Sequence, residues 1–119
     1  MTTILHLAAI VAAEDLKTQD VDCPEWGGAV RMRMMTAAQR DALGAALFDI
    51  ESGAARAGIT RREVLKASII DETGALMLAT DDDYAQLLAK SPAVVDRLFL
   101  AALELNAMTT AAGERLKND

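Results

Sequence analysis

The side chains that most often carry out chemistry are few and isolated in this sequence. His6 is the only histidine, and it lies in an apolar segment where the sequence identifies no partner that would make it a general base. Cys23 is the only cysteine; it precedes Pro24 and has no neighbouring cation to stabilise a thiolate. A single cysteine also excludes an internal disulfide and a Cys-based zinc site, which fits a reducing compartment. We expect neither side chain to be catalytic.

Two further patterns could hold a ligand, but each has a structural explanation. Three aspartates at residues 81–83 could bind a hard cation, yet calcium-binding loops distribute their ligands over about twelve residues. The aspartates follow Thr80, as acidic residues do after the N-cap at the positive end of a helix. Gly27 and Gly28 belong to no phosphate-binding motif. We therefore predict no catalytic residue, no cofactor and no metal, and we do not expect an enzyme.

The overall charge argues against nucleic acid as a partner. The chain has a net charge of -6 and a pI near 4.7, which opposes attraction to phosphate backbones. Four arginines could still form a local basic surface that orients an acidic partner. They are Arg31, Arg33, Arg61 and Arg62. Without interleaved aromatic residues, a solvated face is the simpler interpretation.

The apolar N-terminal segment is expected to form a short amphipathic helix. Residues 4–13 place Ile4, Leu7 and Val11 three and four positions apart. The segment lacks a preceding basic region, so it makes a poor signal peptide, and it is too short to span a bilayer. We expect a soluble cytoplasmic protein without a membrane partner.

The following segment predicts a β-hairpin. Residues 18–23 alternate in polarity and end before Pro24, which lacks a backbone donor. Gly27 and Gly28 supply the positive φ angles of a tight turn. Residues 29–35 then place Met32 and its apolar neighbours on one face and arginines on the other, as in a half-buried strand.

The next pattern predicts the longest helix, over residues 37–57. Thr36 is suited to be its N-cap, and Gly58 is suited to end it. Its apolar line consists of Leu43, Leu47, Ile50, Ala54 and Ala57. At about 100° per residue, Phe48 lies roughly 140° from that line, among small side chains. Such an exposed ring is expected to need a second contact.

The remaining segments predict a second hairpin followed by helices. A β-branched segment at residues 64–70 and the apolar residues 76–78 flank a polar turn, although a capping-box pattern at residues 60–63 would favour a helix instead. Helices are expected over residues 80–90 and 92–106, and residues 108–119 are expected to form a frayed helix or a tail.

These elements predict one α+β domain covering residues 1–119. It is mostly helical, with a small antiparallel sheet from two hairpins packed on the long central helix. The 92–106 helix has an apolar arc of about 200°, whereas packing on one core needs a stripe somewhat over about 100°. We infer an excess of apolar surface that serves partner binding or self-association. The candidate contact residues are Met32, Met34, Phe48, Leu100 and Leu103, although core packing is the simpler interpretation of the methionines.

The order of these motifs resembles that of the tail assembly chaperones of long-tailed double-stranded DNA bacteriophages. The resemblance involves Cys23 to Gly28, the helix start at residues 36–41, the turn at residues 70–74, and residues 87–92 leading to residues 103–106. It implies a non-catalytic protein that binds the phage tape measure protein, keeps it soluble and assists polymerisation of the tail tube. It further implies a homo-oligomer in the host cytoplasm, with the tail tube protein as a second partner, that is absent from the mature virion.

Members of this family are made in two lengths, the longer through a programmed ribosomal frameshift near the end of the short reading frame. The chain resembles the short, non-frameshifted form. Lys117 and Asn118 could be encoded AAA AAC, and an A-ending codon for Leu116 would complete a slippery heptamer. This is a hypothesis that the gene sequence decides, because other codons would remove the slip site.

Two other functions stay open on sequence grounds. A structural morphogenesis protein, such as a tail-completion or head–tail joining protein, would remain in the virion in stoichiometric copies. A small ligand-binding domain or enzyme would require a polar pocket that brings His6 to a carboxylate.

Overall fold

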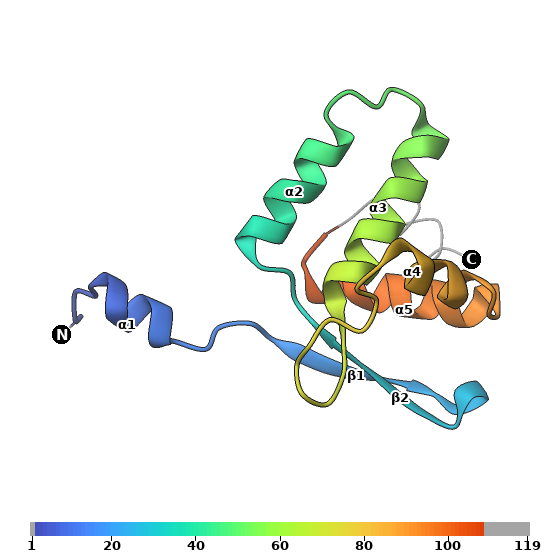
Figure 1. The fold of residues 1–119 in the computed structure, drawn as a ribbon. Helices are drawn as coiled ribbons and strands as arrows, with labels where there is room; N and C mark the ends of the chain where they lie inside the picture. The colour runs from blue at the N-terminus through green and yellow to red at the C-terminus, as the bar shows by residue number, and fades with distance from the viewer. Residues whose placement is uncertain (1, 109–119) are drawn as a thin grey trace.

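The computed structural model describes residues 2–108, and the predicted tail with its slip site at Lys117 and Asn118 falls outside them. Figure 1 shows the order of the elements along the chain. They are α1 (Leu7–Ala12), β1 (Thr18–Cys23), the 3-10 helix η1 (Pro24–Trp26), β2 (Gly28–Arg33), α2 (Ala37–Leu47), α3 (Gly53–Ser68), β3 (Ile69–Ile70), α4 (Asp81–Leu88) and α5 (Pro92–Leu105). Together these elements confirm the predicted α+β class.

The first predicted hairpin is confirmed. Strands β1 and β2 are antiparallel, with a register that runs from Thr18 opposite Arg33 to Cys23 opposite Gly28. The turn is not the predicted Gly-Gly pair alone, because η1 precedes it. Gly27 supplies the left-handed conformation at φ 81°, which suits a residue without a Cβ, and Gly28 already belongs to β2.

The predicted helix over residues 37–57 is wrong as one element, because the chain forms α2 and α3 with a break between them. Helix α2 begins at Thr36 through a reciprocal capping box with Gln39. Ser52 caps α3 by accepting a hydrogen bond from the backbone of Ala55. A new N-cap lets the chain reverse here and gives a helical hairpin. Gly58, the predicted end, lies inside α3.

The strand predicted to end at Ile70, with its start left open between Val64 and Ser68, is confirmed only for Ile69 and Ile70, because α3 continues through Ser68. As part of α3, the side chains of Val64 and Leu65 are buried in the core. This packing outweighs the preference of β-branched residues for strands. Only β3 remains extended, and it pairs with β2 through Ile69 opposite Met32. The second hairpin is reduced to one bridge between Ile70 and Leu76. The alternative prediction of a helix for this segment is correct, although the helix begins at Gly53 and not at the capping-box pattern of residues 60–63.

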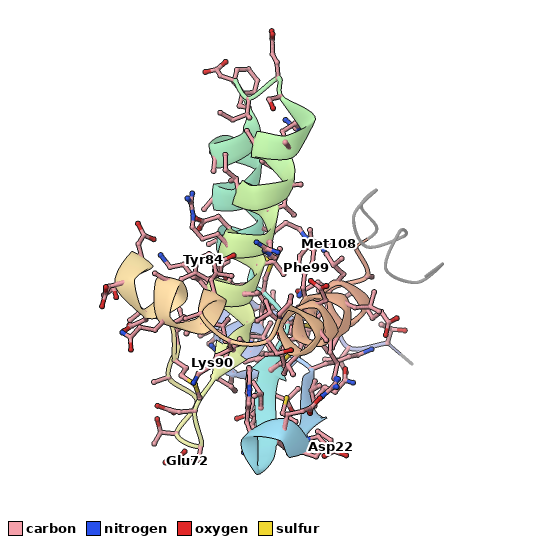
Figure 2. All side chains as sticks on the ribbon, turned by 90° about the vertical axis from the view of Figure 1, so that its right-hand side faces the viewer. Asp22, Glu72, Tyr84, Lys90, Phe99 and Met108 are labelled. Carbon is pink, nitrogen blue, oxygen red and sulfur yellow. The ribbon has the colours of Figure 1, made fainter. Side chains whose placement is uncertain are left out.

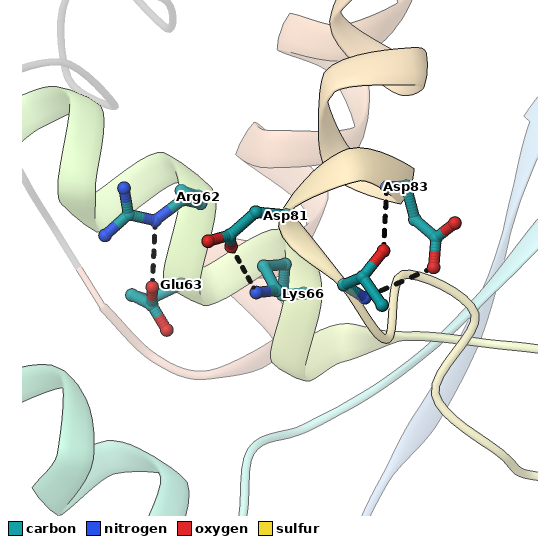
Figure 3. A network of polar contacts seen from close by, with 6 residues as sticks. Arg62, Glu63, Lys66, Asp81 and Asp83 are labelled. Atoms are coloured by element: carbon teal, nitrogen blue, oxygen red, sulfur yellow. Dashed lines mark hydrogen bonds and ion pairs between the residues drawn. The ribbon is translucent and has the colours of Figure 1, made fainter.

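The two C-terminal helices are confirmed. Thr80 caps α4 through a reciprocal capping box with Asp83, and Figure 3 shows the two hydrogen bonds at Asp83. In the same view Lys66 of α3 forms an ion pair with Asp81 at 2.7 Å, which joins the start of α4 to α3. Pro92 is the first residue of α5, as expected from its fixed φ.

Helix α5 forms the centre of the core. It contacts α3, α4 and both strands of the hairpin, and it buries Val94, Val95, Leu98, Phe99, Ala102 and Leu103. At its end the buried Asn106 side chain accepts a hydrogen bond from the backbone of Met35 at 2.7 Å and donates to Ala102 at 2.8 Å. No helix within residues 2–108 has the length and apolar character needed to cross a membrane.

Candidate interaction surfaces

The structure separates the five residues predicted to make partner contacts. Met32 and Leu103 are buried in the core, so neither reaches the surface in this conformation. Met34 and Leu100 are half-buried. Of the five, only Phe48 is largely exposed to solvent, with an exposed fraction of 85%. The wide apolar arc of α5 is mostly covered by the chain itself, because the sheet, α3 and α4 surround this helix.

The first exposed apolar surface is the tip of the α2–α3 hairpin. Figure 1 shows α2 and α3 next to each other, and in Figure 2 they extend together away from the rest of the molecule. Phe48 follows α2 at this tip, and the neighbouring residues 51–58 are all exposed and mostly small or polar. The Arg56 side chain donates to the carbonyls of Leu47 at 2.8 Å and Ile50 at 3.1 Å. These bonds hold the turn that presents the Phe48 ring.

The second surface is the N-terminal arm, which we define as residues 4–16. Figure 1 shows it projecting from the sheet with α1 away from every other element. Helix α1 buries no residue, and Leu7, Ile10 and Val11 are 74%, 54% and 75% exposed. Sequence reasoning identified this helix but missed it as a contact surface. The feature that could have predicted this surface is the apolar stripe itself, because the segment leads directly into an edge strand and no adjacent element would cover it.

The third surface is a groove between η1, the loop before α4, and α4 itself. Its apolar wall consists of Trp26, Met77, Leu78 and Leu87. Asp83, Gln86 and Lys90 line its rim, and its volume is about 310 Å³. That volume lies at the lower end of the range for ligand pockets, roughly 300–1,000 Å³. Sequence reasoning missed this groove because its walls come from three separate segments.

An ion pair fixes one wall of this groove. The Arg97 guanidinium of α5 donates to both carboxylate oxygens of Glu25, at 2.9 and 2.6 Å. These hydrogen bonds are the main reason that the pKa of Glu25 falls to about 2, and the same pairing raises the pKa of Arg97. Because Glu25 belongs to η1 and Arg97 to α5, the pair ties η1, which carries Trp26, to α5.

Two other ion pairs stiffen the surroundings of these surfaces. Asp20 of β1 accepts hydrogen bonds from Arg31 of β2 at 2.8 and 3.1 Å, and this bonding lowers the pKa of Asp20. Hydrogen bonding from Lys66 likewise lowers the pKa of Asp81. The first pair is about half exposed and Asp81 of the second is largely exposed, so both pairs orient elements more than they stabilise the fold.

The residues considered first for chemistry do not converge. His6 lies on the exposed arm, whereas Cys23 is fully buried in the core. Asp81 and Asp83 are engaged in an ion pair and a helix cap. Within residues 2–108 no three His, Cys, Asp or Glu side chains are grouped to hold a metal ion. What the described residues do present is exposed apolar surface at three places.

Comparison with known proteins gives one informative likeness. No family model matches the sequence, and no curated protein matches it. Among solved structures, that of the bacteriophage HK97 tail assembly chaperone is similar, with a TM-score of 0.55 and 19% sequence identity. The similarity covers 76% of this chain and 85% of that chain. At this level of identity the likeness is one of fold.

Proposed function

We propose that this protein is a phage tail assembly chaperone in its short form. It binds the tape measure protein, keeps that protein soluble in the host cytoplasm, and assists polymerisation of the tail tube. Two observations support the proposal: the fold resembles that of the HK97 tail assembly chaperone, and large apolar side chains are left uncovered. The exposed apolar side chains explain how such a chaperone would work, because it must cover apolar surface on another chain.

In this proposal the α2–α3 tip contacts the client. Phe48 is the most exposed aromatic residue of the described chain, and the small side chains around it allow a partner helix to approach closely. Inserting the ring between apolar side chains of a client helix would remove it from water. Burial of a large apolar side chain contributes roughly 1.5–3 kcal/mol, so one such contact strengthens binding about 10- to 100-fold. The net charge of -6 would keep the complex soluble.

Co-expression with the tape measure protein tests the proposal. We expect the wild-type chain to keep the tape measure protein in the soluble fraction, and Phe48→Asp to reduce that soluble fraction several-fold. Ala38→Asp is the matched control, because it adds the same charge at the exposed opposite end of α2. The client assignment of the tip fails if Phe48→Asp folds normally and still solubilises the client.

Purified virions provide the second readout. The proposed chaperone is absent from them, whereas a tail-completion or head–tail joining protein would be present in stoichiometric copies. Failure of the wild-type chain to solubilise the tape measure protein, together with its presence in virions, would replace the proposed function with that structural role.

A further inference from the structure

We infer that the N-terminal arm of one copy docks into the groove between η1 and α4 of a second copy. Among residues 2–108, the arm and the groove are apolar surfaces to which the proposed function assigns no partner. This inference goes beyond the proposed function, which concerns the client, and names a contact between two copies of the chain. It requires no client, so it can be tested without one.

The arm is built to pack against a surface that the described chain does not supply. At about 100° per residue, Leu7, Ile10 and Val11 of α1 fall within an arc of roughly 100°, which is the width of a helix face that packs on one partner. All three side chains are more than half exposed. Such a short helix has little stability by itself in water, and a partner that covers this face would stabilise it.

The arm is too short to seat the whole of α1 beside the Trp26 of its own chain. Met34 donates a backbone hydrogen bond to Lys17 at 2.9 Å, which fixes residue 17 beside the hairpin. The free linker is then residues 13–16, which span at most about 14 Å when extended. Residue 17 lies at one end of strand β1, and Trp26 lies beyond the other end. The six residues of β1 extend over about 20 Å. Figure 1 shows α1 and η1 at opposite ends of the hairpin.

Charge fixes the direction of docking. Lys90 follows α4 at one end of the groove, and within residues 2–108 its side chain has neither a hydrogen-bond nor an ion-pair partner. Glu14 and Asp15 follow α1 and also lack side-chain partners in the described part of the chain. Asp83, at the other end of the groove, is already engaged in the α4 cap. An arm helix parallel to α4 therefore brings its acidic end to Lys90.

The dimensions agree with this arrangement. The six residues of α1 extend over about 9 Å, and the distance along α4 from Asp83 to Lys90 is about 10 Å. A membrane surface is a poorer match for the arm, because residues 2–16 contain no Lys or Arg to contact anionic lipid. The acidic end of the arm instead complements the basic end of the groove.

Concentration-dependent sedimentation of the purified chain, without any client, tests the inference. We expect Leu7→Asp to raise the dissociation constant of self-association roughly 10- to 100-fold, since it removes one apolar contact. Ala12→Asp is the control, because it introduces the same charge in the same helix outside the apolar arc. Trp26 is the only tryptophan and is 37% exposed, so its emission should shift to the blue on association in the wild type but not in Leu7→Asp.

A charge exchange tests the direction of docking. Lys90→Glu alone, or Glu14→Lys with Asp15→Lys, should weaken association about two- to five-fold, and the combined variant should recover it. The inference is overturned if Leu7→Asp and Ala12→Asp associate as the wild type does, or if the combined variant shows no recovery.

Engineered cysteines distinguish a second copy from the arm's own chain. A mixture of Ile10→Cys and Gln86→Cys chains should form a disulfide-linked heterodimer, and Cys23 does not interfere because it is fully buried. A chain carrying both cysteines that closes on itself at all concentrations would overturn the inference. If Phe48→Asp loses the client while association is unchanged, the α2–α3 tip and the arm serve separate contacts.

Discussion

Helices α1 and α5 both consist mainly of Leu, Val and Ala, but one is exposed and the other is buried. Helix α5 buries six of its residues against the sheet, α3 and α4, whereas α1 buries none. The difference lies in what surrounds each helix, because α1 is joined only to an edge strand. An apolar stripe in a sequence therefore identifies a surface that needs covering, but it does not reveal whether the same chain supplies the cover.

The strongest test of this contrast makes the same substitution in both helices. Leu98→Ala in α5 should lower the free energy of unfolding by about 2–5 kcal/mol, because it leaves a cavity in the core. Leu7→Ala in α1 should change it by no more than about 0.5 kcal/mol. Urea denaturation at a concentration where the chain is monomeric measures both. Equal losses would contradict the contrast and place α1 against the body of the fold.

A second test concerns the end of α5. Asn106→Ala removes the acceptor for the Met35 backbone N–H and leaves this buried group unpaired, so we expect a loss of about 1–3 kcal/mol. Ser91→Ala at the other end of α5 is the control, because Ser91 makes no side-chain capping bond. The same denaturation measurement applies. Similar stability of both variants would show that Asn106 does not fasten α5 to the start of α2.

The smallest expected effect is the pH response of the pair between η1 and α5. The pKa of Glu25 is lowered from 4.5 to about 2. The contribution of the pair to folding stability is therefore complete above about pH 4.5 and is lost as the pH falls towards 2. An NMR titration should show the low pKa of Glu25 in the wild type and a return towards the ordinary value in Arg97→Gln. An unchanged pKa in Arg97→Gln would assign the shift to another cause.

Local signals in the sequence predicted much of the fold. The alternation of residues 18–23 gave the hairpin, and Thr36, Thr80 and Pro92 marked three helix starts, because caps and first-turn residues act through nearby backbone groups. The break between α2 and α3 was missed because the apolar line through Leu43, Leu47 and Ile50 continues across it. The segment 64–68 was assigned to a strand although tertiary packing makes it helical.

The candidate contact residues were harder to predict. Phe48 was recognisable because its angular position separates it from the apolar line of its own helix. The sequence did not show that Met32 and Leu103 would be buried in the core. Which face of a strand or helix becomes core depends on where other elements pack. The arm and the groove were missed for the same reason: exposure is a property of the assembled fold rather than of a segment.

The outer part of the α2–α3 hairpin has one further consequence. Between residues 44 and 59 no side chain is buried, so this stretch is held mainly by its own helical bonds and by Arg56. Parts of a protein with few buried contacts open at a small fraction of the global unfolding free energy. We therefore expect the end of the hairpin to open more readily than the α5 core, and in the proposed function this local opening would let it fit different stretches of the client.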